Sequence, residues 1–239
     1  MGIVISEVPQ GMSATGKIAT AVITGHHAYD VVGLQAMFRN IPGIDVYPQN
    51  IEDFVNDTGG SSRFAGRRKI DYDVVVFYNF HQPTPSSVGT AFDPTMMAVL
   101  EGLGDTDQGI LMLHHAILAF RDWDRWDDIC GMTGRVVTGP AFKNQRVPIE
   151  IADDTHPITQ GLSPWEIVDE VYPIGDADES NDILLTTSHP RSMRTIAWAR
   201  NFGKARVFCY QSGHDRKAFN DLGFRTVIGR GIRWLAGQS

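Results

Sequence analysis

Cysteine is scarce in this chain: only Cys130 and Cys209 occur, and they lie far apart in the sequence. Proteins cross-linked by disulfides contain several closely spaced cysteines, and redox or zinc motifs contain cysteines in Cys-x-x-Cys pairs. Neither pattern is present. The chain is therefore not a disulfide scaffold, and its cysteines form no recognisable metal or redox motif.

Positive charge is also limited, because 21 Lys and Arg residues stand against 28 Asp and Glu residues, for a net charge of −7. The densest basic stretch is Arg67-Arg68-Lys69, which we interpret as a solvated loop. Binding to a phosphate backbone needs a concentrated positive face. We therefore expect no nucleic-acid partner.

Long apolar segments are missing as well. No run of roughly 18 uncharged apolar residues occurs, which is about the length that a membrane-spanning helix needs. Residues 1–9 have neither the basic start nor the apolar core of a signal peptide. We expect a cytoplasmic protein with no membrane partner. Walker A and Gly-x-Gly-x-x-Gly motifs are absent too, so we expect no nucleotide cofactor.

The pattern that is present alternates between strand and helix. Residues 1–16 are interpreted as an N-terminal arm and 17–239 as one α/β domain. The expected strands are 18–25, 44–47, 72–78, 109–113 and 205–210, with short strands at 135–138, 147–152, 167–172 and 183–187, and the expected helices are 31–38, 93–102, 121–129 and 219–235. This order predicts a flavodoxin-like three-layer α/β/α domain, with a mostly parallel sheet and an antiparallel-rich insertion.

Seven of the eight histidines stand where a predicted strand runs out: His26, His27, His81, His114, His115, His189 and His214. Ligands of open parallel sheets bind outside the carboxyl ends of the strands. Histidine there suits metal binding or proton transfer. Any one of these histidines taken singly is more often a simple hydrogen-bonding residue, but seven together predict a collective site. The eighth, His156, precedes a proline in a turn, and we interpret it as structural.

Carboxylates and aromatic residues extend this prediction. Asp169 and Glu170 lie in a predicted strand, where Glu170 is the preferred candidate for a general base or a metal ligand. The alternative is a pair of strand residues of which one faces solvent. Asp122 and Trp123 follow the double histidine 114–115, and Trp faces stack on sugar rings. These two residues could equally begin a helix, with Trp126 in the core.

Five stretches of the chain together carry a resemblance to a known family. They are residues 24–30 (TGHHAYD), 113–117 (LHHAI) with Asp122-Trp123, 156–162 (HPITQGL) leading to 169–172 (DEVY), 196–198 (IAW) through 203–208 (GKARVF) to 213–215 (GHD), and 230–237 (RGIRWLAG). In this order the chain resembles the ThuA-like family of trehalose utilisation. The resemblance covers most of the chain from Lys17 to Gly237.

This resemblance implies a class I glutamine amidotransferase-like fold. Amidotransferase chemistry needs a cysteine on a sharp turn between a strand and a helix. The corresponding turn here carries His114 and His115, whereas His214 stands at a position like that of the amidotransferase histidine. No Gly-x-Ser-x-Gly elbow replaces the cysteine. Glutamine hydrolysis is therefore not expected.

The family also implies a role in the use of trehalose or related disaccharides, next to sugar dehydrogenases that make 3-keto sugars. We expect action on a sugar or keto-sugar, as an isomerase or lyase, with His27, His115, Glu170 and His214 as catalytic candidates. The substrate-binding candidates are His26, His81, His114, Asp122 and Trp123. The candidates for one divalent metal, zinc first, are His27, His115 and His214.

Other functions stay open, among them a scaffold subunit that works only with a sugar dehydrogenase as its partner. A metal-dependent hydrolase of a glycoside or ester would use the same histidines to activate water. A sugar- or metabolite-binding protein without catalysis would keep only the pocket. A homo-oligomer is the default expectation for assembly.

Overall fold

The computed structural model describes residues 16–56, 71–86 and 93–238. Residues 1–15 of the predicted N-terminal arm and the basic stretch 67–69 lie outside the described residues. Within these ranges, no helix combines the length and the apolar character needed to cross a membrane.

One half of the sheet is parallel. It contains β1 (Ile18–Thr24), β2 (Ile44–Asn50), β3 (Val74–Phe77), β4 (Gly109–Leu113) and β9 (Ala205–Tyr210), in the order β2-β1-β3-β4-β9. Val22 of β1, for example, lies between Pro48 of β2 and Val76 of β3. Strands β1, β3 and β4 are buried along their whole length and are dominated by apolar residues, as expected for strands covered on both faces.

The other half of the sheet is antiparallel. Strands β8 (Thr195–Phe202), β7 (Asp182–Thr186), β5 (Phe142–Ile151) and β6 (Trp165–Val171) continue the sheet from β9 in this order. The predicted antiparallel-rich part is confirmed, and it includes β8, which the sequence pattern did not predict. The strand predicted at 135–138 is wrong, because only an isolated bridge between Val137 and Ile174 forms there.

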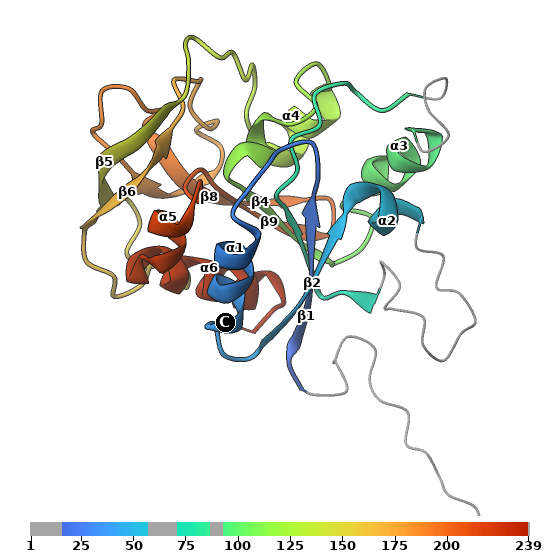
Figure 1. Ribbon diagram of the computed structural model, residues 1–239, viewed down its shortest axis with the longest axis horizontal. Coiled ribbons are helices and arrows are strands. Elements are labelled where there is room, and N and C mark those ends of the chain that lie inside the picture. The colour runs from blue at the N-terminus through green and yellow to red at the C-terminus, as the bar shows by residue number, and fades with distance from the viewer. Residues whose placement is uncertain (1–15, 57–70, 87–92, 239) are drawn as a thin grey trace, which may run out of the picture.

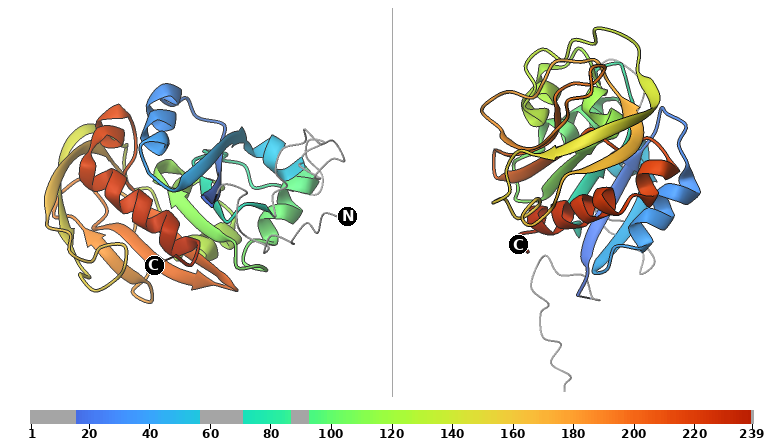
Figure 2. Two further views of the ribbon diagram at one scale, coloured as in Figure 1. Left: turned by 90° about the horizontal axis from the view of Figure 1, so that it is seen from below. Right: turned by 90° about the vertical axis from the view of Figure 1, so that its left-hand side faces the viewer.

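Helices cover both faces of the sheet and make the predicted three layers (Figures 1 and 2). On one face, α1 (Val31–Arg39), α5 (Arg216–Asn220) and α6 (Leu222–Leu235) share a core with the alternate residues of β1, β3 and β4. On the other face, α2 (Ile51–Asn56), α3 (Asp93–Glu101) and α4 (Asp124–Cys130) pack over the remaining residues of these strands.

Two predicted helices have different bounds in the structure. The C-terminal helix predicted at 219–235 is split, because Asp221 has an extended backbone and its side chain caps α6 by accepting from the Phe224 amide at 2.7 Å. The helix predicted from Arg121 begins at Asp124, since Trp123 is extended. Its predicted end is confirmed: Gly131 terminates α4 with a φ of +65°, which favours glycine.

The loops that follow β1, β3, β4 and β9 leave the sheet at the same, carboxyl edge, because these strands are parallel. The short 3-10 helix η2 (His114–Leu118) follows β4 directly. Arg216 at the start of α5 forms a two-point ion pair with Asp30 at the start of α1, with N–O distances of 2.9 and 3.1 Å. This ion pair joins the loops after β1 and β9.

Candidate functional site

Three polar side chains meet at the carboxyl edge and are called the inner group: His114, Glu170 and His214. Glu170 Oε2 lies 3.3 Å from His114 Nε2 and 3.1 Å from His214 Nδ1. The two histidine nitrogens are 3.4 Å apart. His114 and Glu170 are buried, whereas the side chain of His214 keeps 15% exposure. His214 is therefore the member of the group that solvent or a ligand can reach.

The backbone after β4 fixes His114. Its φ of +55° is rare for a residue with a side chain, and it turns the chain sharply from β4 into η2. The ring Nδ1–H donates to the carbonyl oxygen of Gln211 at 2.8 Å. This bond places a proton on Nδ1, because a carbonyl oxygen can only accept. Nε2 is the nitrogen that faces Glu170.

Strand alternation brings Tyr172 to the same face as Glu170. The Tyr172 hydroxyl donates to Glu170 Oε2 at 3.0 Å and lies 2.7 Å from His114 Nε2. Tyr172 is not among the candidate site residues predicted from the sequence. The i, i+2 spacing from Glu170 in a predicted strand is the signal that could have identified it.

Asp169 points away from the inner group and supports it from behind. Its buried carboxylate accepts from the backbone amides of Gly213 at 2.7 Å, His214 at 3.0 Å and Glu170 at 2.8 Å. The antiparallel half of the sheet thereby folds back onto the loop after β9. Asp169 thus fixes the positions of both Glu170 and His214.

The charges of the inner group favour an ion pair. Burial by itself would raise the pKa of Glu170, but the hydrogen bonds and charges of His114 and His214 hold this pKa well below its usual range. The hydrogen bond and the charge of Glu170 raise the pKa of His214 above its ordinary value, against the opposing effect of burial. Near neutral pH, Glu170 is therefore a carboxylate, and His214 keeps its proton to a higher pH than an isolated histidine does.

His27 and His115 form a second pair beside the inner group, with ring centroids 4.4 Å apart. His115 is buried and donates from Nε2 to the Tyr78 carbonyl oxygen at 3.1 Å. Burial, together with the nearby His114 and His27, lowers the pKa of His115 to about 2. His27 is exposed, and its pKa is also lowered, first by partial burial and then by His114. Both histidines are neutral in the folded protein near neutral pH.

A second cluster is called the outer group: His26, Glu52 and His81. The ring of His26 stacks on that of His81 with centroids 3.8 Å apart, and His81 Nε2 lies 3.2 Å from Glu52 Oε1. Burial lowers the pKa of His81, and the hydrogen bond to Glu52 opposes this effect. Glu52 lies on the short helix α2, and no pattern in the sequence identified it as a candidate.

The structure thus draws the predicted residues into two sets. The predicted metal candidates His27, His115 and His214 do not form a converging group together in the described ranges. His214 instead joins His114 and Glu170. Six of the seven strand-end histidines are connected through ring contacts or chain adjacency. His189 is the exception and accepts from the Arg191 amide within its own turn.

Asp122 and Trp123 lie at the turn before α4. Asp122 is exposed, and Trp123 packs edge-on against Phe120 with centroids 5.8 Å apart. Phe120 in turn stacks against His81 at 5.9 Å. Trp123 therefore approaches the outer group through Phe120, and its predicted role in binding a sugar stays a prediction. Trp126 is fully buried in the core.

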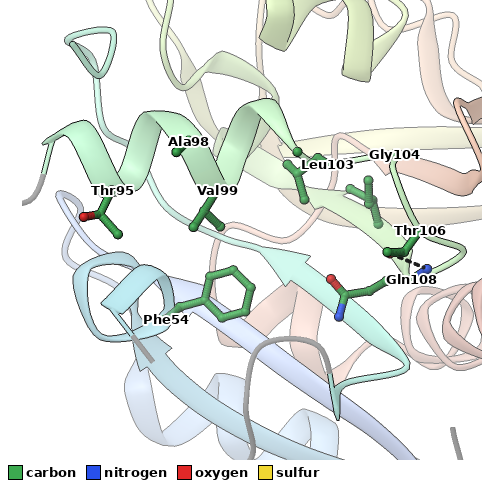
Figure 3. A pocket seen from close by; sticks show the side chains of 10 residues that line it. Phe54, Thr95, Ala98, Val99, Leu103, Gly104, Thr106 and Gln108 are labelled. Carbon is green, nitrogen blue, oxygen red and sulfur yellow. Dashed lines mark hydrogen bonds between the residues drawn. The ribbon is translucent and has the colours of Figure 1, made fainter. Parts of the chain in front are cut away.

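An apolar cavity of about 330 Å³ lies between α2, α3 and the start of β4 (Figure 3). Phe54, Val99, Leu103 and Ile110 contribute to its lining, which contains no titratable side chain among the described residues. A catalytic pocket is expected to combine apolar walls with a few convergent polar groups, titratable ones among them. The inner group, which lies outside this lining, is therefore the better candidate for chemistry.

The inner group also has the chemistry of a zinc site. Two imidazole nitrogens and one carboxylate oxygen are a ligand set of catalytic zinc sites, which leave one position for water or substrate. The hydrogen bond from His114 Nδ1 to a backbone carbonyl is the outer-shell contact that metal-binding histidines commonly make. The same arrangement serves proton transfer without a metal, because the carboxylate raises the basicity of His214.

A nucleophilic cysteine is absent from the turn after β4. That turn carries His114, while Cys130 ends α4 and Cys209 lies within β9. Both thiols are fully buried in the core. The site therefore lacks the thiol that glutamine amidotransferase chemistry requires.

Comparison with solved structures reveals the same fold in several proteins. A ThuA-like protein from Parabacteroides merdae is 21% identical, with a TM-score of 0.68 over 92% of this chain and 90% of that chain. A ThuA-like protein from Bacteroides uniformis is 15% identical, with a TM-score of 0.64 over 96% and 95%. A GMP synthase component from Thermoplasma acidophilum is 10% identical, with a TM-score of 0.55 over 92% and 95%. The fold is thus of the class I glutamine amidotransferase-like type.

No curated protein matches the sequence. The family model described as "ThuA: Trehalose utilisation" matches residues 50–235, which include both the inner group and part of the outer group. The chain therefore belongs to the ThuA family.

Proposed function

We propose that this protein acts on a sugar or keto-sugar by proton transfer at the inner group, with His214 as the catalytic acid and base. The observation that carries the proposal is the contact of a partly exposed imidazole, His214, with a buried carboxylate, Glu170, at 3.1 Å. His214 Nδ1 faces Glu170, so Nε2 is the nitrogen left for a substrate. The family description, trehalose utilisation, supports a carbohydrate as the substrate class.

The chemistry follows from a keto group on the sugar ring, which acidifies the neighbouring C–H bond. Neutral His214 takes this proton, and the electron pair of the C–H bond moves into an enolate. Isomerisation follows when the hydroxyl proton on the deprotonated carbon moves to the former keto oxygen and His214 returns its proton to the former carbonyl carbon, which moves the keto group by one position. Elimination follows instead when the enolate expels a leaving group, with its bonding electron pair, from the carbon beta to the carbonyl. A sugar dehydrogenase is the class of enzyme that would supply such a keto-sugar.

The neighbouring residues position this histidine or complete the site. Glu170 holds His214 by its Nδ1, and His114 and Tyr172 hold Glu170 in turn. His27 is exposed and neutral near pH 7, so its N–H can donate to the keto oxygen as negative charge develops. His115 packs behind His27 and has its Nε2 occupied by Tyr78, which favours a supporting role.

The test is exchange of the α-proton of a 3-keto disaccharide with deuterated solvent, followed by nuclear magnetic resonance. Wild-type protein is expected to catalyse the exchange, and His214→Asn is expected to lower the rate by about 10²–10⁴-fold. His189→Asn is the matched control, because His189 lies in a separate turn. Equal exchange rates in wild type and His214→Asn would refute the proposal. Binding of the sugar without exchange would favour the non-catalytic binding protein.

A second candidate is a metal-dependent hydrolase of a glycoside or ester, favoured by the convergence of three possible ligand atoms in the inner group. A bound zinc ion would supply an activated water there. One equivalent of zinc that copurifies with tag-free protein and is missing from His114→Ala and Glu170→Gln, together with hydrolysis products, would support this candidate. The cytoplasmic location and a homo-oligomeric assembly stay predictions.

A further inference from the structure

The outer group has a geometry of its own that the proposed function does not use. His26, Glu52 and His81 each offer a ligand atom, and these atoms lie within 4.8 Å of one another. The contact from His81 Nε2 to Glu52 Oε1 is 3.2 Å. In a tetrahedral zinc site with bonds of about 2.0–2.1 Å, neighbouring ligand atoms are separated by roughly 3.3 Å. Two of the three donors therefore already have the spacing of a shared zinc ion.

The donor types select a class of cation. Two imidazoles and one carboxylate suit zinc and its transition-metal neighbours, whereas magnesium and calcium prefer oxygen ligands throughout. Three protein ligands leave a position for water or a ligand. His26 is exposed and the Glu52 side chain keeps 34% exposure, so an ion can reach them from solvent. The exposed ring of His26 can also rotate to turn a nitrogen toward the other two donors.

Asn79 provides an independent observation. This residue is fully buried, and its amide nitrogen lies 3.3 Å from His81 Nδ1. Its Oδ1 has no hydrogen-bond partner in the described part of the chain. A half-turn of the amide exchanges the positions of Oδ1 and Nδ2. Oδ1 then accepts from His81 Nδ1–H, and the lone pair of Nε2 faces Glu52. This is the outer-shell contact typical of a metal-bound histidine.

The backbone at the end of β1 brings the outer group together. His26 has a φ of +56°, which is uncommon for a residue with a side chain. This turn directs His26 to His81 while the next residue, His27, packs against His115. Unusual backbone conformations persist where the surrounding structure holds them, and they concentrate at functional sites.

From these observations we propose that the protein binds one zinc-class divalent cation at the outer group, with His26, Glu52 and His81 as ligands and Asn79 as the residue that orients His81. This site is separate from the inner group and does not depend on the proton-transfer chemistry proposed there. The ion would connect the loop after β1 to α2 and to the loop after β3, and so fix the loop that carries His27.

The experiment is titration of tag-free, metal-stripped protein with Zn²⁺ by calorimetry and with Co²⁺ by visible absorption. The variants His26→Ala and Glu52→Gln change side chains that are exposed or partly exposed, so their folds are expected to survive, and circular dichroism checks this. Asn79→Ala tests the orienting contact. Glu170→Gln removes a donor from the inner group only, and His189→Ala is the control for a histidine outside both groups.

Wild type, Glu170→Gln and His189→Ala are expected to bind one equivalent of Zn²⁺ at the outer group. Asn79→Ala is expected to bind about 10–100-fold more weakly, and the two ligand variants more weakly still. A second equivalent that disappears in Glu170→Gln would belong to the inner group and leaves the expectation for the outer group unchanged. No Zn²⁺ uptake by wild type, or uptake that His26→Ala and Glu52→Gln do not weaken, would overturn the proposal. Solvent exchange on a keto-sugar is measured separately, so either proposal can fail alone.

Discussion

The inner and outer groups have the same composition, two histidines and one glutamate, at the carboxyl edge of one sheet. They differ in how they are supported. In the inner group, Glu170 contacts both histidines and Tyr172, and Asp169 secures the backbone behind it. In the outer group, Glu52 comes from a six-residue helix and His26 is exposed. The first arrangement is fixed before any ligand arrives, and the second can adjust its ligands around an ion.

The largest expected effect concerns the support of the inner group. Asp169→Asn places an amide N–H₂ among three backbone N–H donors, so that at least one buried donor loses its acceptor. We expect a loss of about 3 kcal/mol in the free energy of unfolding, the upper end for a buried polar group left without a partner. Urea denaturation measures it. A loss below about 0.5 kcal/mol would contradict the view that the inner group is rigidly supported.

The next effect concerns the neutral histidine between the two groups. The pKa of His115 is about 2 in the folded protein, below the value near 6.5 of an unfolded chain. As pH falls below about 6.5, His115 therefore becomes protonated in the unfolded chain but stays neutral in the folded protein. Its contribution lowers the free energy of unfolding by about 1.4 kcal/mol per pH unit. His115→Gln keeps an N–H donor but does not titrate.

Denaturation curves between pH 6.5 and 5 test this prediction. The slope of stability against pH is expected to be smaller in His115→Gln than in wild type. A residual slope from His27 and His81, whose pKa values are also lowered, is expected to remain, and His214, whose pKa is raised, acts in the opposite direction. Identical slopes in the two proteins would show that His115 does not resist protonation.

A smaller effect concerns the pH dependence of activity, in which Glu170→Gln and Glu170→Asp distinguish the charge of Glu170 from its shape. Glu170 raises the pKa of His214. If neutral His214 removes the substrate proton, activity rises with pH through that pKa. Glu170→Gln removes this charge and lowers the pKa of His214, so the rise is expected at a lower pH. Glu170→Asp keeps the charge and is expected to keep the rise near its wild-type position. The pH dependence of solvent exchange measures both, and a rise at an unchanged pH in Glu170→Gln would exclude this coupling.

The smallest effect belongs to the outer group. Glu52 and His81 form a partly exposed pair, and such pairs contribute at most about 1 kcal/mol to stability. In the absence of added metal, Glu52→Gln is therefore expected to lower the free energy of unfolding by less than about 1 kcal/mol. If Glu52→Gln lowered the free energy of unfolding as much as Asp169→Asn does, the outer group would be as rigidly supported as the inner group, and the contrast between them would be wrong.

Much of the parallel half could be predicted from the sequence. Short apolar runs predicted β1, β3 and β4, with small errors in the bounds of β1 and β3. The histidines after these strands lie at one edge, because parallel strands end on the same side. Periodicity also gave α1.

The pairing of residues across the site was not predictable from the same patterns. The alternation of side chains along a strand does not predict the side-chain direction of a residue with positive φ, such as His114. It therefore could not predict that His114 rather than His115 contacts Glu170. Glu170 reaches the group because the antiparallel half folds back over the edge, and contacts of this kind between distant segments leave no local signal. Glu52 is likewise 29 residues from His81.

Gly25 carries a consequence for sequence tolerance. Its φ is +136°, and a Cβ at this position would lie 2.8 Å from the His81 ring. Any side chain here would have to displace that imidazole or change the backbone conformation at the end of β1. The residue at position 25 therefore limits which residues position 81 can hold, and the reverse also applies. A natural or engineered variant that loses glycine at 25 should therefore be able to keep its fold only by giving up the present placement of His81. One residue that binds nothing thus sets which substitutions the whole outer group can accept.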